Sequence, residues 1–132
     1  MTERRMIVPE GQEWAPKHYQ FAPALKANGM VWISGVVANQ AEPGDEAMQA
    51  AMTTAFETIG KTLAEAGSGW DKVVDITSYH TDLKSQMKAF TAVKAKFCTG
   101  PVYPAWTAIS ITALAVPTGI VEIKVVALAP GD

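Results

Sequence analysis

The sequence predicts an α+β domain in which one β-sheet carries two helices on one face, in the order β-β-α-β-α-β-β. Three observations predict this fold class. Asn28-Gly29 lies between two apolar runs, which is typical of a β-hairpin. Two later segments repeat apolar residues every three or four positions, as amphipathic helices do. The remaining apolar stretches are rich in β-branched residues, which favour strands.

The first 35 residues are expected to form turns and a hairpin. Residues 1–18 contain several proline and glycine residues and are expected to be mixed and turn-rich. A strand is predicted over residues 19–25, and residues 30–35 form its partner. Ser34 and Gly35 end this second strand, where a hydroxyl group and a bare backbone are available to a ligand.

The first helix is expected to follow the Glu42-Pro43-Gly44-Asp45 turn, with Asp45 as its N-cap. Gly67 is the expected stop signal. The apolar positions between them form one helix face against the sheet: Met48, Met52, Ala55, Phe56, Ile59 and Leu63.

A strand over residues 73–81 and a second helix are expected next. Ser85 is the predicted cap of this helix, and Gly100-Pro101 follows its end. The core positions of the helix are predicted to be Met87, Phe90, Val93 and Phe97.

The last two predicted strands cover residues 106–113 and 120–128, and residues 116–119 join them. Both carry apolar residues on both faces, although two helices can cover only one face of the sheet. An uncovered apolar face of that size is unusual on a monomer. The sequence therefore predicts a homo-oligomer, with any site around Glu122 near a subunit interface.

Composition limits the class of protein. The chain has 132 residues, 48% of them hydrophobic, and a net charge of −2, which fits one domain over residues 1–132 without a basic track for nucleic acid. Cys98 is the single cysteine, so no disulfide framework is available and a reducing compartment is favoured. No segment approaches the roughly 20 apolar residues that span a bilayer. The N-terminal residues do not resemble a signal peptide. A cytoplasmic location is the expectation.

Glu122 is the residue at which chemistry is expected, because a carboxylate within an apolar strand is costly to bury unless it is paired or used. Lys124 lies two residues along and is expected on the same strand face. A catalytic role for Glu122 and a structural ion pair with Lys124 both remain open. His18 and His80 match no metal-ligand spacing, so no metal site is expected.

An ordered set of motifs resembles the Rid family, also called YjgF/YER057c/UK114. The set runs over nearly the whole chain: Tyr19, residues 31–35, Gly67 to Trp70, residues 73–83, Phe97, Tyr103-Pro104-Ala105 and Val121-Glu122-Ile123. The resemblance implies a chorismate-mutase-like α+β fold that assembles as a homotrimer with clefts between subunits. Its best-known members hydrolyse reactive imines and enamines to ammonia and a 2-keto acid, without a metal or cofactor.

The resemblance also implies roles for individual residues. Glu122 matches a glutamate that positions the attacking water, and Tyr19 and Ser34 match residues that line the same cleft. Trp106 stands where those members have an arginine that clamps the substrate carboxylate. Tryptophan in place of this arginine removes a fixed positive charge and five hydrogen-bond donors, and it adds a large apolar ring.

Three further positions follow from the same comparison. Ala108 stands where many members have a cysteine, and Phe90 stands where some have an asparagine. Lys124 is a candidate to replace the lost charge. A ligand that stacks on Trp106 fits this pocket better than a simple 2-imino acid does. The alternative is that Trp106 plugs the cleft.

Two functions are therefore predicted from different classes. The first is a cofactor-independent hydrolase or deaminase that acts on an imine, an enamine or a related C–N intermediate in an intersubunit cleft. The second is a non-catalytic trimer that binds a small metabolite or another protein. Ribonuclease activity has been proposed for some relatives, but the acidic balance of this chain argues against a nucleic-acid partner.

Overall fold

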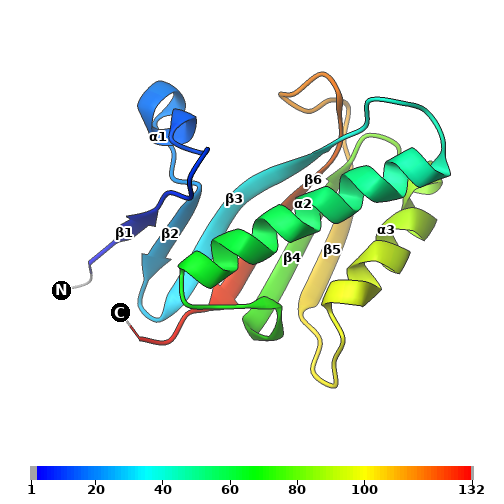
Figure 1. Ribbon diagram of the computed structural model, residues 1–132. Coiled ribbons are helices and arrows are strands. Elements are labelled where there is room, and N and C mark those ends of the chain that lie inside the picture. Colours follow the sequence, from blue (N-terminus) through cyan, green and yellow to red (C-terminus); the bar gives the residue numbers. More distant parts are fainter. Residues whose placement is uncertain (1–2, 132) are drawn as a thin grey trace.

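Helices and strands follow one another along residues 3–131, the part of the chain that this computed structural model describes (Figure 1). Their bounds are β1 (Arg5–Ile7), α1 (Trp14–Tyr19), β2 (Ala24–Ala27), β3 (Met30–Asn39), α2 (Asp45–Glu65), the 3-10 turn η1 (Trp70–Lys72), β4 (Val73–His80), α3 (Leu83–Phe97), β5 (Ala105–Ser110) and β6 (Gly119–Leu128). From β2 onward, the long elements follow the predicted order. The expected domain over residues 1–132 includes residues 1, 2 and 132, which lie outside the described part.

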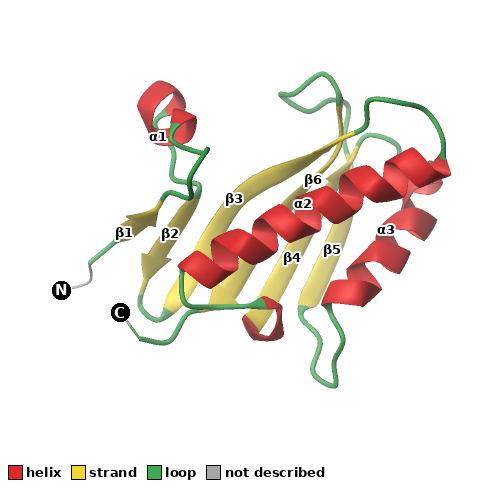
Figure 2. Ribbon diagram, in the orientation of Figure 1, coloured by secondary structure: helices red, strands yellow, loops and turns green. Residues whose placement is uncertain are grey.

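One six-stranded sheet has the order β1-β2-β3-β6-β4-β5. Neighbouring strands are antiparallel except for β4 and β5, which are parallel. The long helices α2 and α3 both lie across one face of this sheet (Figure 2). The prediction of an α+β sheet with two helices on one face is therefore confirmed.

Alternation along β6 separates the two faces of the sheet. Val121, Ile123 and Val125 are fully buried beneath the helices, and the residues between them point to the other side. We call the side that α2 and α3 leave uncovered the open face. The strand registers place these residues on it: Trp32, Val37, Tyr79, Ile109, Glu122, Lys124, Val126 and Leu128. Much of this face is apolar, as the strand pattern predicts.

The core beneath the helices is built around aromatic rings. Phe56 of α2 stacks on Trp70 and Phe97 at centroid distances of 5.1 and 5.2 Å, and it contacts Phe90 of α3 at 5.5 Å. Phe56 and Phe90 are fully buried. Burial of such side chains contributes roughly 1.5–3 kcal/mol each to folding. These contacts pack α2 against α3 and against the η1 turn.

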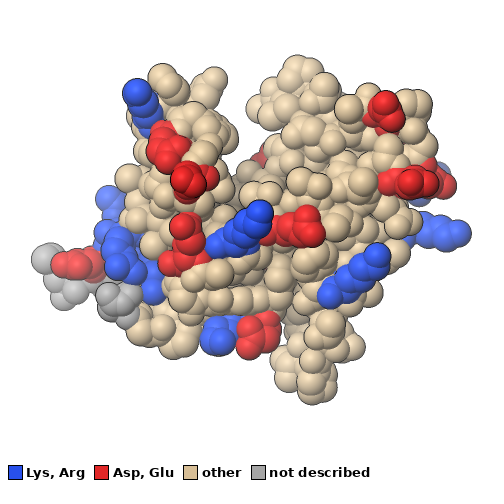
Figure 3. Space-filling model, viewed as in Figure 1, with Lys and Arg blue, Asp and Glu red and all other residues tan. Residues whose placement is uncertain are grey.

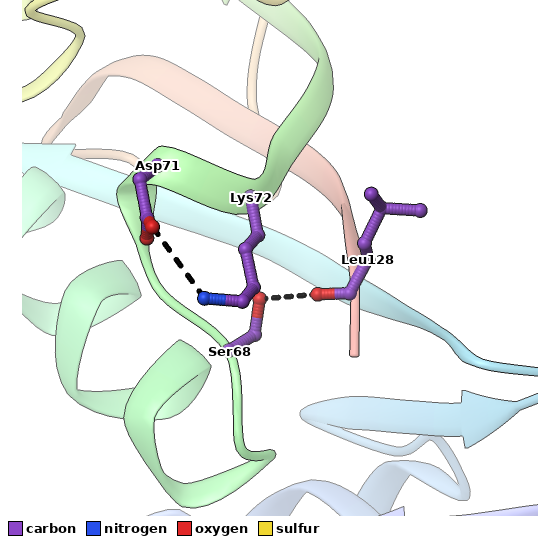
Figure 4. Close-up of polar contacts among 4 residues, drawn as sticks. All are labelled: Ser68, Asp71, Lys72 and Leu128. Carbon is purple, nitrogen blue, oxygen red and sulfur yellow. Dashed lines mark hydrogen bonds and ion pairs between the residues drawn. The ribbon is translucent and has the colours of Figure 1, made fainter. Parts of the chain in front are cut away.

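The turn after α2 is tied to the end of β6. Gly67 has a φ of 78°, which few other residues adopt, and it ends the helix as predicted. The Ser68 hydroxyl then donates to the Leu128 carbonyl at 2.5 Å (Figure 4). Beside it, Lys72 and Asp71 form an exposed ion pair at 3.4 Å, a type that contributes little to stability.

The predictions for the N-terminal region were wrong in two respects. Residues 5–7 form the edge strand β1, and Tyr19 ends helix α1 instead of beginning a strand. Edge-to-face contacts of Trp14 with Tyr19 and Phe21, at 6.1 and 5.7 Å, hold this short helix and the turn behind it. Such contacts between rings override local strand propensity.

Several element ends also differ from the prediction. Gly44 is the N-cap of α2 and Asp82 that of α3, so Asp45 and Ser85 lie within the first turns. Asp45 still favours its helix, because its charge complements the positive N-terminal dipole. Strand β5 ends at residue 110 and pairs with β4, so β6 is not its neighbour.

Candidate functional site

A β-bulge interrupts β3 at Ser34 and Gly35. The register with β6 shifts between Ile33 and Val36, so the strand continues to residue 39 instead of ending at residue 35. The Ser34 backbone N–H donates to the Pro23 carbonyl at 2.9 Å, and its hydroxyl donates to the Ala22 carbonyl at 2.6 Å. The Ser34 hydroxyl thus already donates its proton within the chain. Toward a ligand, its oxygen can act only as a hydrogen-bond acceptor.

Glu122 lies on the open face against this bulge. Its strand neighbours are Val37 of β3 and Tyr79 of β4, and its side chain is half-buried. A Cβ at position 35 would lie 2.7 Å from Glu122 Cγ and would overlap the carboxylate. Gly35 is therefore the residue type that lets the carboxylate lie on the backbone of β3.

The carboxylate of Glu122 makes no hydrogen bond or ion pair with residues 3–131 that the structure records. Lys124 is exposed on the same face but does not pair with it. The structural alternative of a Glu122–Lys124 ion pair is thus not realised within one chain. A half-buried carboxylate without such a partner is available to a water molecule or a ligand.

Tyr79 is a candidate site residue that the sequence analysis missed. It lies directly across from Glu122 in the antiparallel β4–β6 pair, so the Cβ atoms of the two residues are about 5 Å apart. The alternation of residues 73–80 is the signal that would have placed it on the open face. Its phenol group can donate a hydrogen bond near the carboxylate.

Trp106 lies on the opposite side of the sheet, beneath α3. Its indole N–H donates to Ser78 Oγ at 2.9 Å, and its ring stacks on Phe90 at a centroid distance of 5.7 Å and an angle of 28°. Lys94 of α3 places its ammonium 4.6 Å from the centre of the indole. The Trp106 side chain is therefore held in one position by contacts within its own chain.

Ser78 and His80 continue this polar chain into the core. Ser78 Oγ and His80 Nε2 are 2.8 Å apart, and both residues are fully buried. Burial lowers the pKa of His80, and the nearby Gln86 side chain opposes this with a smaller effect. Nδ1 of His80 is buried without a hydrogen-bond partner among the described residues. His80 is therefore a neutral imidazole, and it holds the Ser78 hydroxyl in place to accept the hydrogen bond from the Trp106 indole.

Ala108 lies across from Ser78 on the helix side, so it shares the side of Trp106. The N–H of Ile111 donates to the His80 carbonyl at 2.9 Å. Because the direction of backbone groups alternates along a strand, the N–H groups of Ala108 and Trp106 point away from β4. Strand β5 is the edge of the sheet, so Ala108 offers a backbone donor in place of a cysteine side chain.

The predicted site residues thus form two groups within one chain. Glu122 lies against Gly35, the neighbour of Ser34, at the bulge. Trp106 stacks on Phe90 across the sheet, and Ala108 lies on the same side of β5 as Trp106. Tyr19 ends α1, where it is 68% exposed, and the structure records no contact of it with either group among the described residues. Lys124 also lies across the sheet from Trp106, so within the chain the cation at Trp106 is Lys94. One site that uses both groups requires two subunits.

A hollow of about 280 Å³ opens beside the bulge. Trp14 and Phe21 contribute aromatic walls, and Ser34, Gly35 and Val37 form its floor. Its volume is enough for a small metabolite.

Residues 3–131 contain neither a ready-made cluster of metal ligands nor a helix that could span a membrane. No cluster of three histidine, cysteine or acidic side chains there could hold a metal ion. None of the helices in this range combines the length and apolar character needed to cross a membrane.

The chain is similar to known proteins over nearly its whole length. The family model described as Endoribonuclease L-PSP matches residues 13–129. The chain is 33% identical over 132 residues to the RutC family protein YjgH of Escherichia coli (strain K12), and the match covers 98% of each protein. A solved structure of protein YJGH superposes with a TM-score of 0.83 at 32% identity and covers 98% of this chain and 99% of that one.

A second solved structure is that of Rv2704 from Mycobacterium tuberculosis, described as a member of the YjgF/YER057c/UK114 family. It superposes with a TM-score of 0.79 at 26% identity, over 96% of this chain and 99% of that one. Together with the matched family model, these likenesses in sequence and fold show that the chain belongs to the YjgF/YER057c/UK114, or Rid, family.

Proposed function

We propose that this protein is a cofactor-independent Rid-like hydrolase that deaminates an imine, an enamine or a related C–N intermediate in a cleft between subunits of a homotrimer. The observation that carries the proposal is the half-buried carboxylate of Glu122, which lies on Gly35 without a partner among the described residues. A carboxylate held in this way suits a general base that positions water.

The reaction needs only groups that the chain supplies. Glu122 accepts a hydrogen bond from a water molecule, takes its proton as the oxygen attacks the C=N carbon, and returns a proton to the nitrogen. Collapse of the resulting carbinolamine breaks the C–N bond. The products are a carbonyl compound and ammonia, and water is the only co-reactant. Tyr79 is positioned to orient the water, and Ser34 can accept a hydrogen bond from the substrate.

The division of the site between two sheet faces supports a homotrimer. The open face carries Glu122 among apolar side chains, and the β5 edge carries Trp106 and the backbone donor of Ala108. Contact between the open face of one subunit and the β5 edge of the next would bury apolar surface and bring both groups to one cleft. Burial of that surface is the driving force for assembly.

Trp106 sets the substrate apart from a standard 2-imino acid. A guanidinium group would clamp a carboxylate through two hydrogen bonds, whereas the indole offers one N–H, which is already donated to Ser78. The ring presents an apolar edge at the border of the sheet. A substrate with its own planar or apolar part fits this wall better.

The second candidate function is a non-catalytic trimer that binds a small metabolite or another protein. It is favoured by the contacts of Trp106 with Ser78, Phe90 and Lys94, which fix the ring where it would narrow the cleft. Nucleic acid is not a proposed partner for either function. The net charge is −2, and basic and acidic side chains are interspersed over much of the face in Figure 3. A cytoplasmic location is proposed for both.

The Glu122→Gln variant separates the two functions. A panel of imines, generated in situ from alkyl and arylalkyl amines by an amine oxidase, is followed by imine decay and ammonia release. We expect turnover by the wild type and a loss of at least a hundredfold in Glu122→Gln, because glutamine cannot take the proton. The exposed Glu57 on α2 gives the matched control Glu57→Gln, which keeps full turnover.

A melting curve completes this experiment. Glu122→Gln is expected to melt close to the wild type, because no ion pair is lost within the chain. Undiminished turnover in Glu122→Gln would contradict the assignment of Glu122 as the general base. The absence of turnover for every imine, with binding retained, would favour the non-catalytic trimer.

A further inference from the structure

One buried hydroxyl group, that of Ser78, joins two aromatic rings. Its oxygen accepts a hydrogen bond from the indole N–H of Trp106 at 2.9 Å, and Nε2 of His80 lies 2.8 Å from the same oxygen. Ser78 and His80 are both fully buried, so bulk water does not compete for either bond. Within residues 3–131, the structure records no third hydrogen-bond partner for the Ser78 side chain. The direction in which the Ser78 proton points therefore decides both bonds.

Only one direction of this proton serves both rings. When neutral His80 carries its own proton on Nδ1, Nε2 is an acceptor, so Ser78 donates to Nε2 and receives the indole N–H on a lone pair. In the other neutral tautomer both rings donate to Ser78, and the hydroxyl proton is left without an acceptor. Nδ1 is buried without a hydrogen-bond partner in the described part of the chain, so it does not favour this second tautomer. The tautomer with the proton on Nδ1 is therefore the stable one.

Protonation of His80 removes this arrangement. An imidazolium ring has no lone pair, so Nε2 becomes a second N–H donor toward the Ser78 oxygen. The hydroxyl proton then has no acceptor inside the core, which is costly for a buried group. Rotation of the Ser78 side chain relieves this cost, but it also withdraws the oxygen from the indole of Trp106.

The side chains around His80 favour its neutral form. Burial lowers the pKa of His80, and the Gln86 side chain opposes this with a smaller effect. Phe90 of α3 meets the imidazole edge-on at a centroid distance of 4.9 Å, and the facing residues of β5 and β6 are Ser110 and Val121. None of these three side chains carries a charge. The imidazolium therefore forms only as the pH falls below neutrality.

Charged groups on the surrounding elements do not offset this burial. On α3, Lys94 lies over the ring of Trp106, where its positive charge disfavours a second cation, and Asp82 is exposed at the start of the helix. Strand β5 contains no ionisable residue. Those of β4 and β6 near His80 lie on the open face, across the sheet: Asp75, Tyr79, Glu122 and Lys124. Within the described part of the chain, no carboxylate therefore gives a charged His80 a buried partner.

We propose that His80 is a positioning residue that acts through Ser78 on Trp106, and that protonation of His80 frees the indole from Ser78. In the neutral state the indole N–H is held, and in acid only Phe90 and Lys94 still contact the ring. Trp106 sets the substrate of the proposed hydrolase. The inference therefore concerns the regulation of that site and rests on the proposed function, but the release of the indole is observable without a substrate.

A purely structural role for His80 makes a different prediction. If the imidazole only fills the core, its replacement lowers the melting temperature, and Phe90 and Lys94 hold the Trp106 ring in one place at every pH. A structural role therefore leaves the indole N–H of Trp106 in the same environment whether His80 is neutral or charged.

Nuclear magnetic resonance of the two rings distinguishes these roles. The ¹⁵N-labelled protein is titrated from pH 7.5 to pH 5.0, and the His80 imidazole nitrogens and the Trp106 indole N–H are followed, assigned with His80→Gln and Trp106→Phe. At pH 7.5 we expect the His80 proton on Nδ1. As the pH falls, the Trp106 indole proton should move upfield, because it loses its acceptor, with the same midpoint as His80. The indole resonances of Trp14 and Trp70 should not follow that midpoint.

Two variants locate the effect. Ser78→Ala removes the link, so its Trp106 indole proton should already lie upfield at pH 7.5 and should not move with pH. His18→Gln, at an exposed histidine, should behave like the wild type.

A Trp106 indole resonance that stays unchanged in the wild type over this pH range, whether or not His80 titrates, would overturn the inference. A His80 proton on Nε2 at pH 7.5, or an equal movement of the indole resonance in Ser78→Ala, would also overturn it. The wild-type titration decides the question if Ser78→Ala does not fold. Absence of turnover in the imine assay would contradict the hydrolase but not the titration, so the two proposals fail separately.

Discussion

The carboxylate of Glu122 occupies the space that a side chain at Gly35 would fill. The two residues lie on adjacent antiparallel strands, β6 and β3, at the bulge where the register shifts. The φ angle of Gly35 is not in the left-handed region, so backbone conformation does not require glycine there. Close approach of the carboxylate requires it.

Gly35→Ala should therefore displace the Glu122 side chain. The added methyl group would overlap the carboxylate, and relief requires a new Glu122 rotamer or a shift of β3. We expect a destabilisation of about 1–3 kcal/mol, as for overpacking, together with loss of turnover. Urea denaturation and the imine assay measure the two effects.

The double variant Gly35→Ala, Glu122→Ala is the control for this explanation. Truncation of Glu122 removes the overlapping atoms, so the destabilisation by Gly35→Ala should largely disappear in that background. A coupling energy near zero between the two substitutions would show that Gly35 serves another purpose.

The sequence predicted the elements whose signals are local. Asn28-Gly29 placed the β2–β3 turn, apolar spacing placed α2 and α3, and Gly67 placed the end of α2. Helix α1 escaped prediction because its support comes from contacts between rings around Trp14, which spacing does not reveal. The strand that begins at residue 30 was also expected to end at residue 35, because the sequence at the Ser34–Gly35 bulge resembles that of a strand end.

The residues of the candidate site were predicted from the sequence, but their positions relative to one another were not. Period-2 alternation placed Glu122 and Lys124 on one face, as observed, but it cannot tell which face of β5 aligns with which face of β6. That relation depends on β4 lying between them, a non-local pairing. For the same reason, the sequence analysis did not find Tyr79 or Lys94, because these residues lie beside the two groups only in the folded chain.

The protein is predicted to form a homotrimer in solution. Sedimentation equilibrium should give a species of three times the 14.1 kDa chain mass, because the open face leaves apolar side chains uncovered. Val126→Lys, on that face, should dissociate it, whereas Lys61→Glu on the exposed side of α2 should not. A wild-type protein that sediments as a monomer would contradict both the trimer and the intersubunit site.

Standard 2-imino acids should be poor substrates. A charge-assisted bidentate clamp on a desolvated carboxylate contributes several kcal/mol, and at about 1.4 kcal/mol per decade its loss costs on the order of a thousandfold in kcat/KM. An amino-acid oxidase coupled to this protein measures imine decay. Trp106→Arg should recover part of the activity. Wild-type rates that equal those of an arginine-bearing relative would show that Trp106 does not replace the clamp.

Stability should depend on pH through His80. Burial holds its folded-state pKa below about 6.5, its value in the unfolded chain, so the unfolded chain gains a proton first as pH falls. The stability from neutral His80 is therefore complete above about pH 6.5 and is lost below it, at up to about 1.4 kcal/mol per pH unit. Urea denaturation between pH 7.5 and 5.5 should show this slope in the wild type and in His18→Gln, whose histidine is exposed, but a shallower one in His80→Gln. An unchanged slope in His80→Gln would mean that other groups cause the pH dependence.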